Sequence, residues 1–259
     1  MAISYSTSAS SVASGVTSTG LSITTVSGNT RLIAAAKTEG SNGITVTATF
    51  NSVSMTQITT LELGNSGGTY HKLHVFELIN PSIGAYSVSF SFSGNINVSL
   101  VAASYTGDDT SRSITNFTSN TGRTISHTSI NGWAILLAGS ANTGGGDDTM
   151  TASTNSTLRV ASGNTGNKGI SGLFDSNAQV NGVYAMSYDS SGAINGGVVV
   201  TIPIQISTEQ NDVQSITDIY SSDVDATYSD NLTISENISS PTWANARKNT
   251  KTITNQQKS

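Results

Sequence analysis

Apolar and polar residues alternate with a period of two along much of the chain, most regularly between residues 73 and 107. From Tyr86 to Phe92 every second residue is aromatic or valine, and the residues between them are serines. This alternation is typical of an antiparallel strand that buries one face. We interpret the stretch 73–107 as three consecutive strands, with turns at Asn80-Pro81 and Gly94-Asn95. An aromatic inner face needs a second layer to cover it, so the pattern predicts a second sheet.

Two other stretches, 32–36 and 133–138, are continuously apolar. Runs of this length are typical of buried strands, although a short helix at 32–36 fits the periodicity as well. Residues 1–30 are rich in serine and threonine with short apolar alternation, which we interpret as two edge strands. The predicted core consists of Leu32, Ile33, Val75, Tyr86, Val88, Phe90, Phe92, Trp133, Ile135 and Leu137.

The composition of the chain changes after residue 206, because no glycine follows Gly197 and apolar residues become sparse. We therefore predict an all-β protein with a two-layer antiparallel β-sandwich, jelly-roll-like, over residues 1–206, and an extended C-terminal arm over residues 207–259. The arm has too few apolar residues to bury a core of its own. Its short alternating groups favour strand addition to a sheet edge of another subunit. The candidate interface residues are Ile219, Tyr228, Ile234 and Trp243.

Charged residues make up only 10% of the chain, against about 25% in typical globular proteins. With a net charge of −5 and 11 scattered Lys and Arg residues, the chain lacks the dense basic patch that binds nucleic acid. The absence of cysteine excludes disulfides and thiolate metal sites. The first residues lack the basic and apolar regions of a secretory signal, and no apolar run reaches the ~18 residues of a membrane span. We expect synthesis in the cytoplasm and no membrane insertion.

Few residues suggest a catalytic or metal-binding role. His71, His74 and Glu77 are spaced closely enough to suggest a metal site, but a strand points His74 away from the other two. The pairs Asp108-Asp109 and Asp147-Asp148 lie in polar loops that could supply calcium ligands, although solvated turn aspartates are the more frequent case. No serine lies in a nucleophile motif. We therefore predict no catalytic residues, no metal and no bound cofactor.

Aromatic residues offer one binding alternative. They are either a platform for stacking sugars or ordinary core residues, and the core is the more frequent use of aromatics at alternate strand positions. The candidates are Tyr70, Tyr105, Trp133, Tyr184 and Tyr188.

Three segments resemble a β-sandwich module of phage virion structural proteins and bacterial surface proteins. They are Gly-Asn-Thr-Arg-Leu-Ile at 28–33, Phe-Glu-Leu-Ile-Asn-Pro-x-x-Gly-x-Tyr-x-Val at 76–88 and Ala-Ser-Tyr-Thr-Gly at 103–107. The resemblance implies fold more than function. Because the chain starts without a recognisable signal peptide, the resemblance favours a non-enzymatic virion protein. Such a protein decorates or cements the capsid or tail through contacts with copies of itself and other virion proteins. The alternative is an adhesion module, such as a receptor-binding or fibre protein, that binds a host-surface glycan through loops 107–123 and 140–148.

Overall fold

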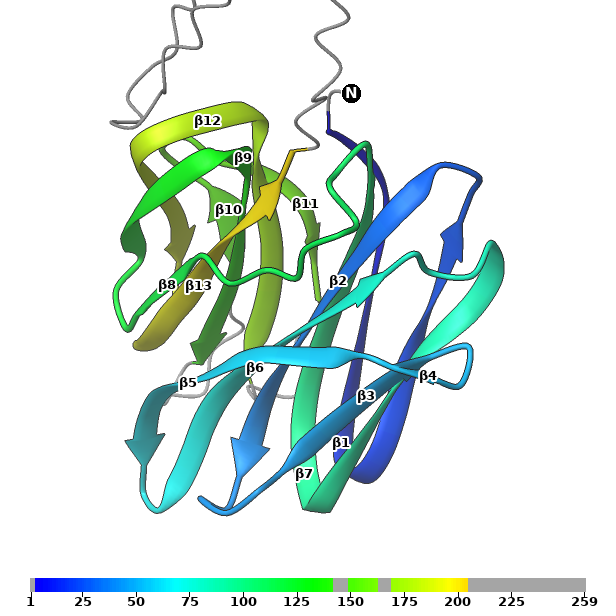
Figure 1. Cartoon of the computed structure of the whole chain (residues 1–259). Coiled ribbons are helices and arrows are strands. Elements are labelled where there is room, and N and C mark those ends of the chain that lie inside the picture. The colour runs from blue at the N-terminus through cyan, green and yellow to red at the C-terminus, as the bar shows by residue number, and fades with distance from the viewer. Residues whose placement is uncertain (1–2, 142–148, 163–168, 205–259) are drawn as a thin grey trace, which may run out of the picture. The chain divides into compact units, whose positions relative to one another are not determined.

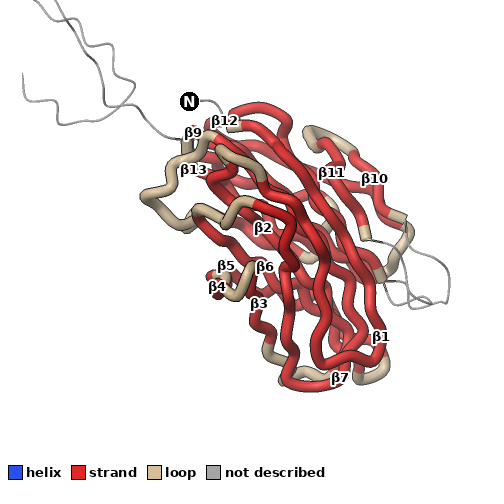
Figure 2. The backbone as a smooth tube through the Cα atoms, turned by 90° about the vertical axis from the view of Figure 1, so that its right-hand side faces the viewer, coloured by secondary structure: helices blue, strands red, loops and turns tan. Residues whose placement is uncertain are grey.

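The described part of the protein is built from antiparallel strands alone, which confirms the all-β prediction (Figures 1 and 2). The computed structural model describes residues 3–141, 149–162 and 169–204. The C-terminal arm and the boundary at 206/207 lie outside these residues, so both stay predictions. A jelly-roll order of strands is likewise not confirmed.

The first sheet has seven strands. They are β1 (Ser4–Thr25), β2 (Asn29–Gly40), β3 (Val46–Phe50), β4 (Val53–Ser54), β5 (Thr56–Ser66), β6 (Thr69–Ile79) and β7 (Gly84–Thr106). Its centre is β7, which pairs with β1 along one side and with β3 and then β2 along the other. Strand β6 continues the sheet beyond β2, and β5 follows β6.

The second sheet has six strands. They are β8 (Phe117–Asn120), β9 (Thr124–Ala141), β10 (Met150–Ala152), β11 (Thr157–Ala161), β12 (Ile170–Ser190) and β13 (Ile194–Pro203). Strand β9 lies between β12 and β13, while β8 pairs with β13 and both β10 and β11 pair with β12.

The two continuous apolar runs are central strands that are buried on both faces. In β9, Trp133, Ile135 and Leu137 face the core between the sheets, whereas the residues between them belong to a core made by the second sheet alone. In β2, Ile33 and Ala35 face the same inter-sheet core, and Leu32, Ala34 and Ala36 face a core made by the first sheet alone. Each sheet therefore bends around apolar residues of its own, and the two sheets also share a third core.

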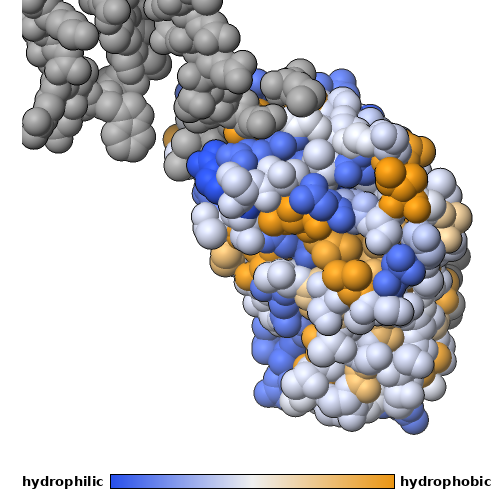
Figure 3. All heavy atoms as spheres, turned by 45° about the vertical axis from the view of Figure 1, so that its right-hand side comes forward, coloured by the Kyte–Doolittle hydropathy of each residue, from blue (hydrophilic) through white to orange (hydrophobic). Residues whose placement is uncertain are grey.

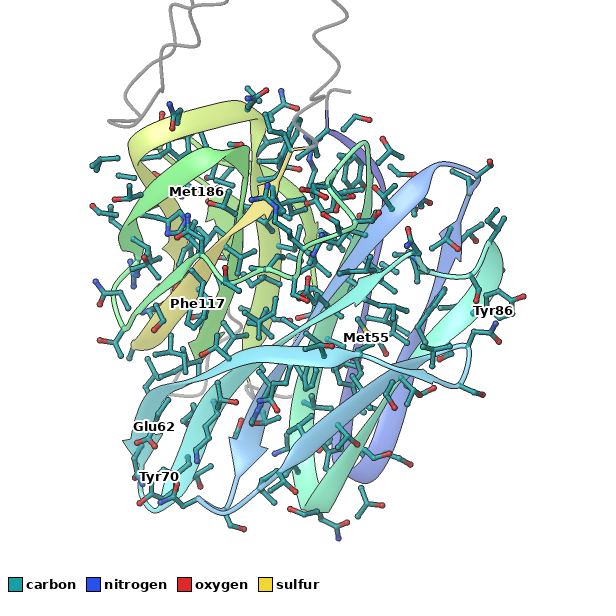
Figure 4. All side chains as sticks on the ribbon, viewed as in Figure 1. Met55, Glu62, Tyr70, Tyr86, Phe117 and Met186 are labelled. Carbon is teal, nitrogen blue, oxygen red and sulfur yellow. The ribbon has the colours of Figure 1, made fainter. Side chains whose placement is uncertain are left out.

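This arrangement corrects the prediction of a single inner face. Val88, Phe90 and Phe92 are buried, but they belong to the first-sheet core and not to the core shared with the second sheet. Phe90 packs edge to face against Phe76 of β6, with ring centroids 5.8 Å apart. Of the ten predicted core residues, only Tyr86 is not fully buried; it packs against the margin of the first-sheet core, where its ring contacts Phe50 (Figure 4).

The predicted turn at Gly94-Asn95 is wrong, because β7 continues through it as one strand. The two halves of β7 are not hairpin partners; both pair with β1, with a register shift opposite Val16. Asn97 stabilises the irregularity by accepting hydrogen bonds from the Gly15 amide at 3.2 Å and from Ser14 Oγ at 2.5 Å. Gly15 has a φ of 64°, which favours glycine. Residues 4–25 are correspondingly one long strand and not two.

Candidate functional site

A buried arginine joins three segments that are distant in the sequence. The Arg31 side chain is fully buried and forms ion pairs with Glu77 and Asp108. Its Nε lies 2.6 Å from Asp108 Oδ2, and its Nη1 donates to Glu77 Oε2. Arg31 lies in β2, Glu77 lies in β6, and Asp108 follows the end of β7.

Strand pairing explains why these side chains meet. Arg31 of β2 is aligned with Ile79 of β6 on one side and with Tyr105 of β7 on the other. Side chains two positions apart share a face of a strand, so Arg31 and Glu77 lie diagonally across neighbouring strands. Asp108 follows the end of β7 and reaches the same guanidinium from the other side.

The network fixes the path of the loop that follows β7. Arg31 Nη2 donates hydrogen bonds to the carbonyl oxygens of Asp109 at 3.0 Å and Arg112 at 2.8 Å. Glu77 accepts a hydrogen bond from the Ile114 amide at 3.0 Å, and the Ile114 side chain joins the inter-sheet core. The loop is thus attached to the sheet through both its backbone and one apolar side chain, while Ser111, Arg112 and Ser113 are exposed.

The two adjacent aspartates have different environments, which corrects the prediction that both are solvated. Asp108 is buried and charge-paired, whereas Asp109 is near the surface. Asp109 accepts hydrogen bonds from Ser111, which lower the pKa of its carboxyl below the ordinary value, and it also pairs with Arg112. The Asp109 amide donates to Pro203 O at 2.9 Å, so the end of β13 is attached to this loop.

A second polar cluster links the two sheets beside the first. Asp175 of β12 is fully buried and accepts hydrogen bonds from Arg159 Nε at 2.7 Å and from the Tyr105 hydroxyl at 3.3 Å. Burial, followed by the nearby Asp175 carboxylate, raises the pKa of Tyr105 well above its ordinary value. The Arg159 guanidinium lies over the Tyr5 ring at 4.4 Å. These contacts tie β1 and β7 of the first sheet to β11 and β12 of the second.

The three histidines are buried among ordinary strand contacts. Burial lowers the pKa of His71 and His74 to about 4, with smaller contributions from Lys37 and Lys72 respectively. His74 makes hydrogen bonds with the hydroxyls of Thr38 and Thr60, on the face of β6 that points away from the second sheet. Both imidazoles are therefore neutral at pH 7.

His127 of β9 lies in the second sheet. It makes hydrogen bonds with Thr118 at 3.0 Å and Thr201 at 2.7 Å, and burial lowers its pKa.

Two of the residues considered as metal ligands have other partners. Glu77 pairs with Arg31, while His74 lies on the opposite face of the strand. Within the described ranges no group of three or more His, Asp or Glu residues is arranged to hold a metal ion. Asp147 and Asp148 lie outside the described residues.

The candidate aromatic platform does not form. Tyr105, Trp133 and Tyr188 are buried, and the two partly exposed members, Tyr70 and Tyr184, belong to different sheets. Tyr70 lies near Glu62 at the end of the β5–β6 hairpin (Figure 4). The core interpretation is therefore the correct one for the three buried rings.

The described surface is dominated by neutral polar side chains. Figure 3 shows a mostly pale face of intermediate hydropathy, with apolar side chains gathered in a band across its middle. The large apolar residues that are exposed are Val26, Val53, Ile83, Phe117 and Val183. The candidate interface residues Ile219, Tyr228, Ile234 and Trp243, as well as residues 142–148 of the second candidate binding loop, lie outside the described ranges.

No family model, curated protein or solved structure matches the chain. Among the residues that the structure describes, no helix is long and apolar enough to cross a membrane. The candidate site must therefore be judged from its own geometry, in which the Arg31 network positions the 107–116 loop.

Sequence reasoning did not find this network. The one available signal was a lone arginine at the start of an otherwise apolar run, Arg-Leu-Ile-Ala-Ala-Ala. Charged residues are almost never fully buried unless they are paired, so that arginine implied acidic partners without identifying them.

Proposed function

We propose that this protein is a non-enzymatic structural component of a phage virion. It is made in the host cytoplasm and decorates or cements the capsid or tail surface. Its contacts are with copies of itself and with other virion proteins, and they include the C-terminal arm, residues 207–259.

The observation that carries this proposal is the use of charged side chains inside the fold. Arg31, Glu77, Asp108 and Asp175 are buried and paired with one another or with Arg159, and they hold strands and a loop in place. The exposed strand faces carry mainly serine and threonine. These five titratable groups are thus engaged in stabilising contacts, and a neutral surface suits repeated contacts with identical subunits.

The position of Ile204, the last described residue before the arm, supports a role of the arm in assembly. Ile204 forms a bridge with Asp108, so the chain leaves β13 beside the anchored loop. The segment that follows has alternating apolar residues and one tryptophan after Pro241, a pattern suited to strand addition with an aromatic anchor.

A truncated chain that ends at Ile206 tests this proposal. We expect it to fold with the same strand content as the full chain, because the described cores contain no residue beyond 204. We also expect it to lose the oligomers or particle binding of the full chain, as measured by light scattering and co-sedimentation with particles. Full-strength assembly of the truncated chain would contradict the role of the arm, and failure to fold would assign the arm to the domain.

The alternative function is binding of a host-surface glycan, and one observation favours it. The 107–116 loop is fixed by Arg31 and Glu77 while its polar tip is exposed, and a preorganised loop loses little entropy when it binds a ligand. Retention of the full chain on a glycan array, abolished by Arg112→Ala, would support this alternative.

A further inference from the structure

Strand β1 is a long edge strand of the first sheet in the part of the chain that the structure describes. Within the described residues β1 spans 22 positions and pairs with β7 alone. Figure 2 shows it running along the side of the first sheet. A strand at an edge presents a row of unpaired backbone N–H and C=O groups, which another strand can bind.

Part of β1 lacks the usual protection of such an edge. Proteins protect edges with charged residues, proline or short strands, and β1 contains neither a charged residue nor a proline. Its N-terminal part contacts Arg159 of β11 through Tyr5 and Ser8, and an irregularity follows near Val16. The stretch 18–25 beyond it pairs with β7 in an uninterrupted register.

The other strands at the ends of the two sheets are protected or short. Strand β5 carries Glu62 and two register shifts, and β11 carries Arg159. The remaining edge strands β4, β8 and β10 have two, four and three residues. Of these edge strands, β1 is therefore the best suited to strand pairing, through its stretch 18–25.

We infer that stretch 18–25 of β1 pairs with the same stretch of a second copy, so that the first sheet continues across a two-fold axis. This inference rests on the proposed assembly function and names one of its contacts. A two-fold axis perpendicular to the sheet pairs a strand with itself in antiparallel orientation, which is the orientation of every pairing in this sheet. An uncharged strand meets no like-charge repulsion when it faces its own copy.

The alternation of side chains restricts the register of this pairing. Leu21, Ile23 and Thr25 are buried on the inner face, whereas Ser18, Ser22 and Thr24 are exposed. Residues directly opposite each other on paired strands point to the same face. Even-numbered positions must therefore oppose even-numbered positions, and the two-fold axis lies midway between the two copies of a single residue.

The absence of cysteine in the chain allows a direct test in the full-length protein. Ser18→Cys, Ser22→Cys and Thr24→Cys each introduce one thiol on the exposed face, and opposed residues lie within the Cα distances that a disulfide needs. Thr47→Cys is the matched control, because Thr47 is exposed on β3 with β7 between it and β1. We expect the position nearest the axis to form a disulfide dimer on the order of a hundredfold faster than Thr47→Cys, since preassociation raises the local thiol concentration from about 10 micromolar to about 1 millimolar.

A charge variant provides an independent measurement. Ser22→Lys places two like charges close together at the axis, so we expect it to weaken the oligomer, whereas Thr47→Lys leaves its molar mass in light scattering unchanged. If the parent is oligomeric but no β1 cysteine crosslinks faster than the control and Ser22→Lys assembles normally, the β1 contact is wrong and the proposed assembly function stands. The absence of β1 crosslinks is also expected if the C-terminal arm binds this edge, and it contradicts the β1 contact in that case too. If the parent is a monomer at all concentrations, both the β1 contact and the proposed assembly function are wrong.

Discussion

Arg31 and Asp108 lie 77 positions apart in the sequence, yet their side chains are fully buried and in contact at 2.6 Å. This contact and the pairing of Arg31 with Glu77 connect β2, β6 and the end of β7. The guanidinium also binds two loop carbonyls, so one side chain determines how the chain passes from the first sheet to the second.

Replacement of Arg31 by methionine is expected to destabilise the protein strongly. The substitution keeps an apolar side chain of similar length but leaves Glu77 and Asp108 buried without a counter-charge. Breaking a buried pair in this way costs about 3 to 5 kcal/mol in the free energy of unfolding. Urea denaturation of the purified variant measures this change.

Arg112→Met is the matched control, because the Arg112 side chain is 56% exposed and its pair with Asp109 lies at the surface. We expect a loss of no more than about 1 kcal/mol for this variant. Equal effects of the two substitutions would show that the buried network does not stabilise the fold.

The all-β class and most of the core were predictable because they depend on local alternation. The serine-aromatic alternation of residues 86–92 identifies a strand without any knowledge of its neighbours. Which strand pairs with it does not follow from that alternation, and the turn predicted at Gly94-Asn95 was wrong for this reason. Glycine and asparagine there accompany a bend stabilised by Asn97 and Gly15, which belongs to a strand some 80 residues earlier.

Phe90→Ala tests the first-sheet core. Phe90 is fully buried against Phe76, so the substitution removes contacts and leaves a cavity. Large-to-small changes of this kind cost about 3 to 5 kcal/mol. Thermal unfolding should show a clear decrease in melting temperature, whereas Phe117→Ala, at a position 39% exposed, should change it little. A Phe90→Ala protein that melts within a degree or two of the parent would contradict the assignment.

The buried histidines predict a loss of stability in mild acid. His71 and His74 have pKa values near 4 in the folded protein and near 6.5 when unfolded. Between these values the unfolded chain binds protons that the folded chain does not, so the free energy of unfolding decreases as the pH falls from about 6.5 toward about 4. At pH 7 and above this contribution disappears.

Urea midpoints measured from about pH 7.5 to about pH 4.5 test this dependence. The double variant with His71→Gln and His74→Gln should show a shallower decrease across the same range. An unchanged slope in the double variant would mean that these histidines are protonated as readily in the folded state as in the unfolded one.

The charged network was not predictable from sequence because its partners are distant in the chain. Glu77 was considered as a metal ligand and Asp108 as a solvated turn residue. Only the alignment of β2 with both β6 and β7 brings them to Arg31. That Arg31, Glu77 and Asp108 meet follows only from the strand order of the folded sheet.

The Tyr105 hydroxyl predicts a smaller effect at the junction between the sheets. Tyr105→Phe removes the donor to the buried Asp175 and leaves Arg159 as its remaining side-chain partner. A hydrogen bond to a charged group contributes about 1.5 to 3 kcal/mol, so urea denaturation should show a loss in that range. Tyr5→Phe, which removes only a bond to Ser8 in a partly buried position, should cost less. Equal losses would assign no special role to the Tyr105–Asp175 bond.

The central claim is that the protein works by assembling with copies of itself. Its most direct test is the molar mass of the full chain, measured by light scattering over a wide range of protein concentrations. We predict a closed oligomer of defined mass that persists on dilution, as expected for a building block of a virion. A monomer of 26.6 kDa at every concentration would contradict the claim.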